Sequence, residues 1–424
     1  MKLSKEIENF LLEEAKSRFL KYVQIHTTSD ENSTSDPSTD RQFDLAKVLA
    51  SELKELGCRK VILDEHCYVY GFLDATKGYE NVQAIGLIAH MDTSPAENGK
   101  NVQPIIHENY NGKAIKYPKN PELVLTPEDS PELKKFIGMD IITSSGDTLL
   151  GADDKAGIAE IMAAVAAWRK FPILDHGPIV ICFTPDEEIG RGTKNINLEY
   201  LPAYCYTFDG GEIGELEIEC FDAWKANIQF NGISVHPGYA KNRMVNAIEI
   251  ACRFVSQIPE AETPQHTENR EGFYHLYHLE GDCVKAKAVL ILRDFESKNN
   301  KKRIKYLEQL IATFETRYPG LKIDLTTEHS YENMIVYLKK HQQVIQKAAQ
   351  AIKQAGIELK ETIIRGGTDG ARLSARGVPT PNIFAGGLLF HSLKEYVPVQ
   401  ALEKAAEVIL YLAGNWLEEK QAEK

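Results

Sequence analysis

Apolar strand-like segments alternate with helical segments along the first half of this chain. Short apolar runs at 84–89 and 179–183 are typical of buried strands, whereas 43–56 and 154–169 carry apolar residues at helical spacing. Strands that alternate with helices in this way form a mainly parallel sheet with helices packed on its faces. The pattern therefore predicts an α/β fold for this part of the chain.

The pattern changes between about residues 222 and 333. Six elements are expected there, in the order strand, helix, strand, strand, helix, strand: 223–230, 245–257, 272–279, 285–293, 301–318 and 322–327. This is the order of the ferredoxin-like split unit. A helix near 342–355 and a strand in "TPNIFAG" then return to the first pattern. We therefore expect a larger domain in two parts, 1–221 and 334–424, with a smaller α+β domain inserted at 222–333.

Charge and composition exclude several classes of function. The chain has 424 residues, too many for one hydrophobic core, and its net charge of −12 argues against nucleic acid as a partner. No apolar run reaches membrane-spanning length, and the N-terminal segment has a helical apolar face rather than the core of a signal peptide. None of the seven cysteines forms a C-x-x-C pair. We expect a cytoplasmic protein without disulfides, and a mobile loop at 27–41.

Five segments place acidic residues or histidines just beyond a predicted strand or at the start of a helix. The residues are, in chain order, His90 with Asp92, Asp153 with Asp154, Glu187 with Glu188, Asp209, and His391. Ligands and catalytic groups of α/β sheets collect at the carboxyl ends of the strands. We therefore expect these side chains to lie together at one edge of the sheet.

Each of these residues has a plain structural alternative when it is considered alone. A buried histidine can be a satisfied core residue, an aspartate can cap a helix, and an acidic pair can be a solvated turn. Together, however, two histidines and several carboxylates at one edge need cations to neutralise them. Mixed nitrogen and oxygen ligands suit zinc, or else manganese or cobalt, better than calcium or magnesium. His90 could bind through one ring nitrogen while Asp92 accepts a hydrogen bond from the other.

Eight motifs resemble those of the peptidase T family of tripeptide aminopeptidases: "HMDTS", "LLGADDKAGIAEI", "TPDEEIG", "FDGG", "VHPGYAKNRMVNA", "GFYHL", "RGGTDGARLS" and "PTPNIFAGGLLFH". This family belongs to a wider group of di-zinc exopeptidases and deacylases that includes acetylornithine deacetylase and succinyl-diaminopimelate desuccinylase. The resemblance extends from about residue 20 to residue 415. It implies a zinc-exopeptidase-like fold, with a parallel sheet flanked by helices and a ferredoxin-like lid.

The resemblance also implies a set of metal ligands. Asp153 would bridge two zinc ions, His90 and Asp209 would complete the ligands of one ion, and Glu188 and His391 those of the other. A cis peptide bond between Asp153 and Asp154 is a further implication. Around the last ligand this chain has "LLFHSLKE" where the family usually has "HNFHGKFE". The different neighbours of His391 predict altered recognition of the end of the substrate.

Catalytic and substrate-binding roles are implied in the same way. Glu187 would be the general base, Asp92 would orient His90, and His236 would close over the substrate to stabilise the oxyanion. Without the resemblance, His236 is better explained as a turn residue. Substrate contacts are implied for three further residues, of which the arginines could instead form structural ion pairs: Asn246, Arg293 and Arg365.

The sequence therefore predicts a cytoplasmic di-zinc aminopeptidase that acts on short peptides, above all tripeptides. One alternative keeps the metals but hydrolyses another amide, as a dipeptidase, a carboxypeptidase or an N-acyl amino acid deacylase. A second alternative is a metal-binding protein without catalytic activity, against which the intact Glu187 argues. A homodimer paired through the sheet edges of the inserted domain is plausible.

Overall fold

The computed structural model describes residues 2–417, which form two compact units. Unit 1 contains residues 2–218, 337–362 and 368–417, and unit 2 contains Glu219–Val336 and Ile363–Gly367. The predicted second part of the catalytic domain, 334–424, extends into residues 418–424, which lie outside the described residues. Unit 2 includes a short segment at 363–367 that is remote in sequence from the rest of the unit.

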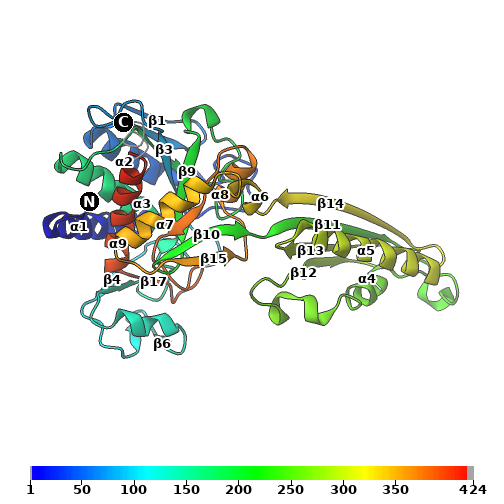
Figure 1. Ribbon diagram of the computed structural model, residues 1–424. Coiled ribbons are helices and arrows are strands. Elements are labelled where there is room, and N and C mark those ends of the chain that lie inside the picture. The colour runs from blue at the N-terminus through cyan, green and yellow to red at the C-terminus, as the bar shows by residue number, and fades with distance from the viewer. Residues whose placement is uncertain (1, 418–424) are drawn as a thin grey trace. The chain divides into compact units, whose positions relative to one another are not determined.

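The centre of unit 1 is an eight-stranded sheet with the order β1-β2-β8-β3-β9-β16-β10-β15 (Figure 1). β3 is parallel to β8 and β9, and β9 is parallel to β16, whereas β2 pairs antiparallel with β1 and β8, and β10 pairs antiparallel with β16. The mainly parallel α/β sheet is thus confirmed. The strand bounds are Lys60–Leu63 (β1), Val69–Leu73 (β2), Ile85–His90 (β3), Ile179–Thr184 (β8), Tyr204–Gly210 (β9), Glu215–Cys220 (β10), Lys360–Ile364 (β15) and Asn382–Phe384 (β16).

Helices flank this sheet. Helices α1, α3 and α9 pack on one another and α7 packs on α9, while α8 places Leu373 in an apolar cluster with Ile88 of β3 and Cys182 of β8. Almost every residue of α3 is buried, because its alanines and Gly157 allow the neighbouring elements to approach closely. The helix bounds are Lys5–Tyr22 (α1), Gln42–Glu55 (α2), Ala152–Lys170 (α3), Ile335–Leu338 (α6), Gln342–Gln354 (α7), Asp369–Ala375 (α8) and Val399–Asn415 (α9).

Two small sheets of unit 1 lie in a region where the sequence analysis assigned no elements. One has the order β17-β7-β4 and the other pairs β5 with β6. Most of these strands have only three residues, too few to show a periodicity. Their bounds are Ile105–His107 (β4), Ile115–Tyr117 (β5), Asn120–Leu125 (β6), Ile141–Thr143 (β7) and Tyr396–Pro398 (β17), and a 3₁₀ helix spans Pro131–Phe136. β17 matters for function because it directly follows the loop that carries His391.

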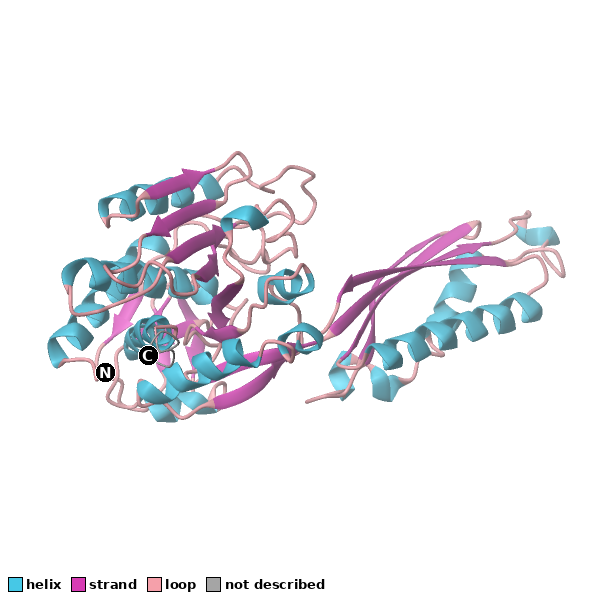
Figure 2. Cartoon of the chain, turned by 45° about the horizontal axis from the view of Figure 1, so that its top comes forward, coloured by secondary structure: helices cyan, strands magenta, loops and turns pink. Residues whose placement is uncertain are grey.

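Unit 2 is an antiparallel sheet of order β12-β13-β11-β14 with two helices on one face (Figure 2). The chain order is strand, helix, strand, strand, helix, strand, which is the ferredoxin-like split unit. Alternate residues of β11, such as Ile228 and Phe230, pack against Phe254 and Phe314 of the helices. The bounds are Asp222–Asn231 (β11), Ala247–Val255 (α4), Phe273–Gly281 (β12), Lys285–Asp294 (β13), Ser297–Arg317 (α5) and Lys322–Tyr331 (β14).

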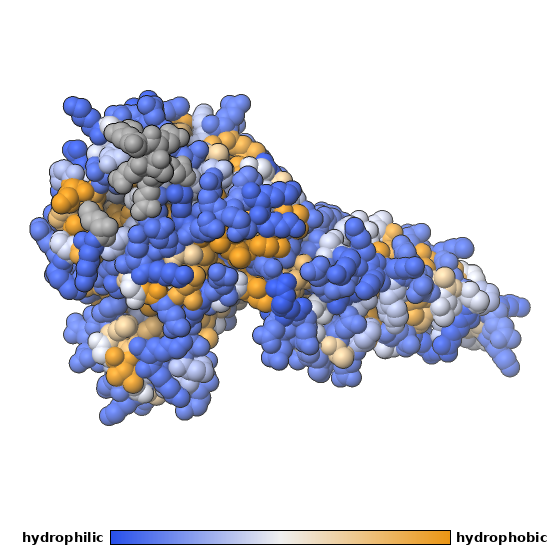
Figure 3. All heavy atoms as spheres, in the orientation of Figure 1, coloured by the Kyte–Doolittle hydropathy of each residue, from blue (hydrophilic) through white to orange (hydrophobic). Residues whose placement is uncertain are grey.

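The state of the cysteines and the polarity of the surface can be compared with the expectations from composition. All seven cysteines fall in the described part of the chain and are free thiols, as predicted. Among residues 2–417, no helix combines the length and apolarity needed to span a bilayer. Hydrophilic residues cover most of the face shown in Figure 3, with apolar patches between them.

The polar segment 27–41 is a loop, and its Ser38 is tied by two hydrogen bonds to the buried Asp186 carboxylate.

Candidate metal centre

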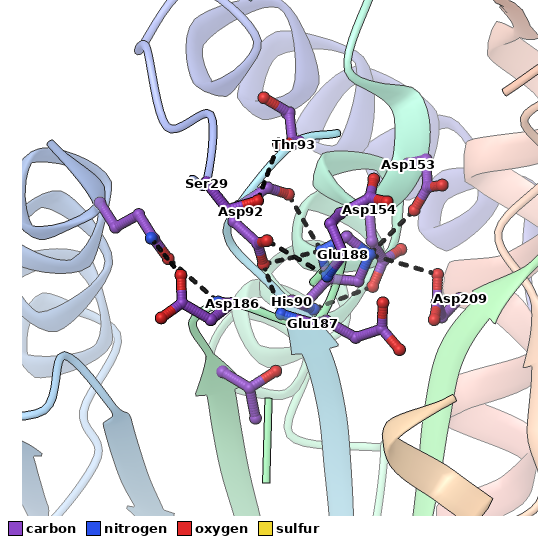
Figure 4. Close-up of polar contacts among 12 residues, drawn as sticks. Ser29, His90, Asp92, Thr93, Asp153, Asp154, Asp186, Glu187, Glu188 and Asp209 are labelled. Carbon is purple, nitrogen blue, oxygen red and sulfur yellow. Dashed lines mark hydrogen bonds and ion pairs between the residues drawn. The ribbon is translucent and has the colours of Figure 1, made fainter. Parts of the chain in front are cut away.

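The parallel strands of unit 1 bring the predicted metal ligands to one edge of the sheet. Figure 4 shows His90, Asp153, Glu188 and Asp209 among them. His90 is the last residue of β3, Glu188 follows β8, and Asp209 lies at the end of β9. His391 lies in the loop after β16, and Asp153 lies at the start of α3. Because β8, β3, β9 and β16 are adjacent and parallel, their carboxyl ends meet at the same edge.

One group of side chains forms around the buried ring of His90. Its Nε2 lies 2.8 Å from Asp153 Oδ1 and 3.5 Å from Asp209 Oδ1. The His90 side chain is only 2% exposed, so its ring is shielded from bulk water. His90 Nε2 therefore lies close to two carboxylates. The ligand atoms of His90, Asp153 and Glu188 lie within 4.8 Å of one another, as do those of His90, Asp154 and Asp209.

A second group forms around His391. Its Nε2 lies 2.9 Å from Glu188 Oε2 and 3.1 Å from Asp153 Oδ2. The two oxygens of Asp153 thus face different histidines, as a bridging carboxylate would. The other oxygen of Glu188, Oε1, is buried and has no hydrogen-bond partner among the described residues. A buried carboxylate oxygen without a hydrogen-bond partner fits a position beside a bound cation.

The electrostatics of these groups show an excess of buried negative charge. Burial raises the pKa of Glu188 to about 8 and the pKa of Asp209 to about 6. Burial opposes ionisation of Asp153 too, but hydrogen bonds from His391 and His90 lower the pKa of this carboxyl. The same contacts with Asp153 and Glu188 raise the pKa of His391 to about 11. Carboxylates this close to the two imidazoles favour a positive charge between them, which is the charge that bound metal cations would supply.

Asp92 connects His90 to the turn that carries the two glutamates. The Nδ1 atom of His90 lies 3.0 Å from the main-chain oxygen of Asp92 and 3.4 Å from its Oδ1. The Asp92 carboxylate accepts hydrogen bonds from the amides of Glu187 (2.9 Å) and Glu188 (3.2 Å). The orienting contact to the imidazole is therefore made mainly by the backbone of Asp92, while its side chain holds the glutamate turn.

The residue before the two glutamates is also fixed. Asp186 has a φ of +54°, and its buried carboxylate accepts hydrogen bonds from the Ser38 amide and the Gln42 side chain at 2.6 and 2.7 Å. A left-handed backbone is uncommon outside glycine and is held here by these contacts. The sequence analysis did not single out Asp186, because an aspartate beside two glutamates carries no signal of burial.

Glu187 lies in an environment that favours its protonated form. Burial raises the pKa of its carboxyl well above the ordinary value, and the negative charges of Asp369 and Asp209 raise it further. Asp369 is itself buried and accepts a hydrogen bond from Thr184 Oγ1 at 2.8 Å. Sequence reasoning missed Asp369 because it lies at the start of α8, not at the end of a strand.

The turn before α3 separates the roles of its two aspartates. The peptide bond between Asp153 and Asp154 is cis, which confirms the expectation drawn from the family resemblance. The Asp154 carboxylate accepts hydrogen bonds from the His90 amide at 3.0 Å and from the Gly157 amide at 3.3 Å. The helix-capping alternative therefore applies to Asp154, and Asp153 is left to face the histidines.

The four residues predicted to contact the substrate all lie in unit 2. His236 is exposed, and its Nδ1 accepts a hydrogen bond from the Gly238 amide at 3.1 Å. The side chain of Asn246 caps α4 by accepting from the Glu249 amide at 3.4 Å. Both residues therefore have local structural contacts in addition to any contact with substrate.

The two arginines are held within unit 2. Arg293 donates to the Leu292 carbonyl at 3.1 Å and its guanidinium lies over the ring of Tyr331, 5.4 Å from the centroid. Arg365 donates to the carbonyls of Asn269 and Glu271 at 2.7 and 3.0 Å. Both terminal nitrogens of Arg365 are engaged, since the second donates to Oγ1 of Thr267 at 3.0 Å. These contacts bind the 363–367 segment to unit 2.

Comparisons with known proteins identify the family and the fold of this chain. The family model described as "Peptidase family M20/M25/M40" matches residues 150–415. The chain is 46% identical over 394 residues to a peptidase T of Caldanaerobacter subterraneus, covering 93% of this chain and 96% of the relative. Among solved structures, aminopeptidase PepT from Bacillus cereus aligns with a TM-score of 0.74 at 22% identity, covering 96% and 98% of the two chains. A tripeptidase from Staphylococcus aureus aligns with a TM-score of 0.76 at 22% identity, covering 96% and 99%.

Proposed function

From the premise that this chain belongs to peptidase family M20/M25/M40 and is an aminopeptidase, we propose that it holds two zinc ions and releases the N-terminal residue of tripeptides. The observation that carries this proposal is the position of Asp153, whose two carboxylate oxygens lie 2.8 and 3.1 Å from two different histidines. Tripeptides as substrates are supported by the similarity to peptidase T and by the structural likeness to a tripeptidase.

The donor set fits two zinc ions. His90, Asp153 and Asp209 would hold one ion, and Asp153, Glu188 and His391 the other. Each set mixes imidazole nitrogen with carboxylate oxygen, a combination that zinc accepts and that manganese or cobalt can share. Bound there, the two ions would supply the Lewis acidity that activates a water molecule and polarises the scissile carbonyl.

Glu187 is the proposed general base and acid. Its carboxylate takes a proton from the attacking water and then delivers that proton to the leaving amine. The carboxylate must be ionised to take this proton, and the positive charge of two bound metal ions would favour the ionised form. Asp92 keeps Glu187 in place through the backbone amide. By the family resemblance, His236 is the proposed oxyanion donor, and the proposed substrate contacts are Asn246, Arg293 and Arg365.

Substitution of the two adjacent glutamates tests these assignments. Glu187→Ala is expected to keep both metal ions and to lower kcat on a tripeptide by about 10²- to 10⁴-fold, the usual contribution of a general base. Glu188→Ala is expected to lose metal, since it removes the carboxylate that pairs with His391. Metal content by mass spectrometry and tripeptide turnover measure the two outcomes. The reverse pattern would overturn the assignment of the two roles.

The competing functions are separated by a second assay. An aminopeptidase cleaves a tripeptide with a free amine and spares the same peptide with a blocked N-terminus. Cleavage of only the blocked peptide would show that the chain is a deacylase or carboxypeptidase with the same centre. A zinc-loaded protein that hydrolyses neither substrate, nor any dipeptide, would support a metal-binding role without catalysis.

Organisation and location complete the proposal. We propose that residues 222–333 act as a lid and dimerisation domain, since the sheet of unit 2 ends in edge strands β12 and β14 that could pair with a second copy. A cytoplasmic location is proposed from the seven free cysteines, because thiols persist in a reducing compartment. Sedimentation of the purified protein tests the dimer directly.

A further inference from the structure

A buried carboxylate outside the proposed chemistry lies four residues after His391. Glu395 is 1% exposed and directly precedes β17. Its Oε2 accepts hydrogen bonds from the amides of Leu150 and Gly151, both at 2.8 Å, and its Oε1 accepts from the amide of Asp153 at 3.1 Å. Three backbone donors from a segment more than 240 residues away thus converge on one side chain.

The geometry of the turn explains why it takes a carboxylate. Gly151 has a φ of +81°, a left-handed conformation in which successive amides can point to the same side of the backbone. Such concave runs of amides bind anions. Here the anion is a side chain of the same chain, and both of its oxygens are used. A neutral amide in its place would present an NH₂ group to at least one of the three donors.

The hydrogen bonds of Glu395 connect two loops that carry proposed metal ligands. The turn at 150–153 ends in Asp153, and the loop before Glu395 carries His391. The two loops meet twice, once where His391 Nε2 lies 3.1 Å from Asp153 Oδ2 and once where Glu395 holds the backbone of the turn. Since His391 is 48% exposed and has a φ of +58°, its own loop is only partly covered. A buried anchor four residues away restricts how far that loop can move from Asp153.

We propose that Glu395 is a positioning residue that sets the separation between the Asp153 carboxylate and the His391 ring, and thereby the affinity of the metal position formed by Asp153, Glu188 and His391. This inference rests on the proposed two-metal centre. In the proposed role, Glu395 touches neither substrate nor metal and acts only through the backbone of the 150–153 turn. The metal position around His90 and Asp209 depends on it less, because those two residues are held by β3 and β9.

Glu395→Gln tests the proposal, because glutamine preserves the size of the side chain and removes one acceptor. Zinc binding to the metal-free protein is measured by calorimetric titration of both sites. The zinc affinity of the position around His90 and Asp209 is expected to stay within about threefold of wild type. The affinity of the position around Glu188 and His391 is expected to weaken by about 10- to 100-fold, the range typical of residues that orient metal ligands. With cobalt in place of zinc, the absorption spectrum of the ion beside Glu188 and His391 should change, while that of the ion beside His90 and Asp209 should not.

Two further variants keep the result interpretable. Glu160→Gln removes another buried carboxylate from unit 1, one that accepts no hydrogen bond within residues 2–417, and should bind both ions like wild type. Glu395→Asp keeps the charge and should recover part of the lost affinity. Unchanged affinity at both sites in Glu395→Gln would overturn the proposal. Equal weakening of both sites, together with a large loss of thermal stability, would also overturn it by showing a general structural role.

Failure of the two-metal centre would be recognised separately. If wild type binds fewer than two ions, the proposed function fails whatever the variant does. Hydrogen exchange of the metal-free proteins then decides on Glu395. At least tenfold faster exchange of the amides at 150–153 in Glu395→Gln supports the anchoring role, and unchanged exchange overturns it.

Discussion

Two adjacent glutamates have different chemical surroundings in this protein. The Asp92 carboxylate accepts hydrogen bonds from both of their amides, so the backbone of the pair is held at one point. Glu188 then meets His391 at 2.9 Å, whereas the pKa of Glu187 is raised by burial and by the negative charge of Asp369. Burial raises the pKa of Glu188 as well, so the imidazole partner is what distinguishes the two glutamates. A carboxylate paired with an imidazole suits metal binding, and one whose neighbours are other carboxyls suits proton transfer. The proposed division of roles therefore rests on the neighbours of each glutamate and not on residue type.

A buried carboxyl away from the centre shows the cost of such burial. Glu160 of α3 is fully buried, and neither of its oxygens has a hydrogen-bond partner in the described part of the chain. Burial raises the pKa of this carboxyl well above its ordinary value. Because the folded pKa is raised, folding stability is lost as the pH rises above about 4.3, the pKa of an unfolded glutamate, by up to about 1.4 kcal/mol for each pH unit.

Glu160→Met is therefore expected to stabilise the protein, and more so at higher pH. Methionine fills a similar volume without an unsatisfied polar group, which is worth about 1–3 kcal/mol before the pH-dependent part is added. Urea unfolding of variant and wild type at pH 5 and pH 8 measures the difference. A gain in stability that is the same at both pH values would contradict the assigned cause, as would a loss.

At the scale of elements, the contact between α3 and β9 places two proposed ligands. Asp153 lies at the start of α3, and Asp209 lies near the end of β9. A Cβ atom at Gly157 would lie 1.9 Å from the carbonyl oxygen of Phe208 and 2.6 Å from Asp154 Oδ1. The helix can approach the strand this closely only because it has glycine at that position. The absence of a side chain at Gly157 therefore allows the short distance between α3 and β9.

Gly157→Ala is expected to destabilise the protein by about 1–3 kcal/mol or more, because the added methyl forces the helix from the strand. It should also weaken metal binding, since the start of α3 moves with the helix. Gly414→Ala in α9 is the matched control, as no atom of the described residues outside the backbone of α9 and the two chain neighbours lies within 4 Å of the added methyl. That control should gain about 0.5–1 kcal/mol from helix propensity. Denaturant unfolding compares the two, and equal stabilities would refute the packing argument.

At the scale of the whole molecule, the proposed functional residues are divided between two units. The metal-facing residues belong to unit 1, which is built from three stretches of the chain. His236, Asn246, Arg293 and Arg365 belong to unit 2, which has an apolar core of its own. Metal ions bound in unit 1 would stabilise that unit by linkage, while unit 2 would keep the stability of its own core.

Removal of metal is therefore expected to affect the units unequally. After chelation, hydrogen exchange should accelerate in the segments of unit 1 that hold the centre, namely 85–92, 150–157, 184–190 and 386–396. Strands β11 to β14 of unit 2 should exchange as before. Exchange mass spectrometry of the zinc-loaded, chelated and reloaded protein measures this. Uniform acceleration across both units would contradict the division, and no acceleration at all would argue against a bound metal.

The elements differ in how far they could be foreseen. The predicted strand at 285–293 is Lys285–Asp294, because long strands with one buried face show a clear alternation. The predicted helix at 301–318 begins earlier, at Ser297, since its first turn has no apolar residues to mark it. The three-residue strands β4, β5 and β7 were not foreseen. They are stabilised by pairing with other segments and not by a pattern of their own.

The α/β class and the gathering of His90, Glu188, Asp209 and His391 follow from the sequence alone. The physical reason is that a periodic pattern predicts parallel strands, and parallel strands end at the same edge. The family resemblance implied Asp153 as the bridge, but only the folded chain gives its distances of 2.8 and 3.1 Å to the two histidines and shows Glu395 hydrogen-bonded to the turn that carries it. Those contacts join segments far apart in sequence, and their distances depend on how helices, strands and turns pack together. No local pattern of residues records such distances.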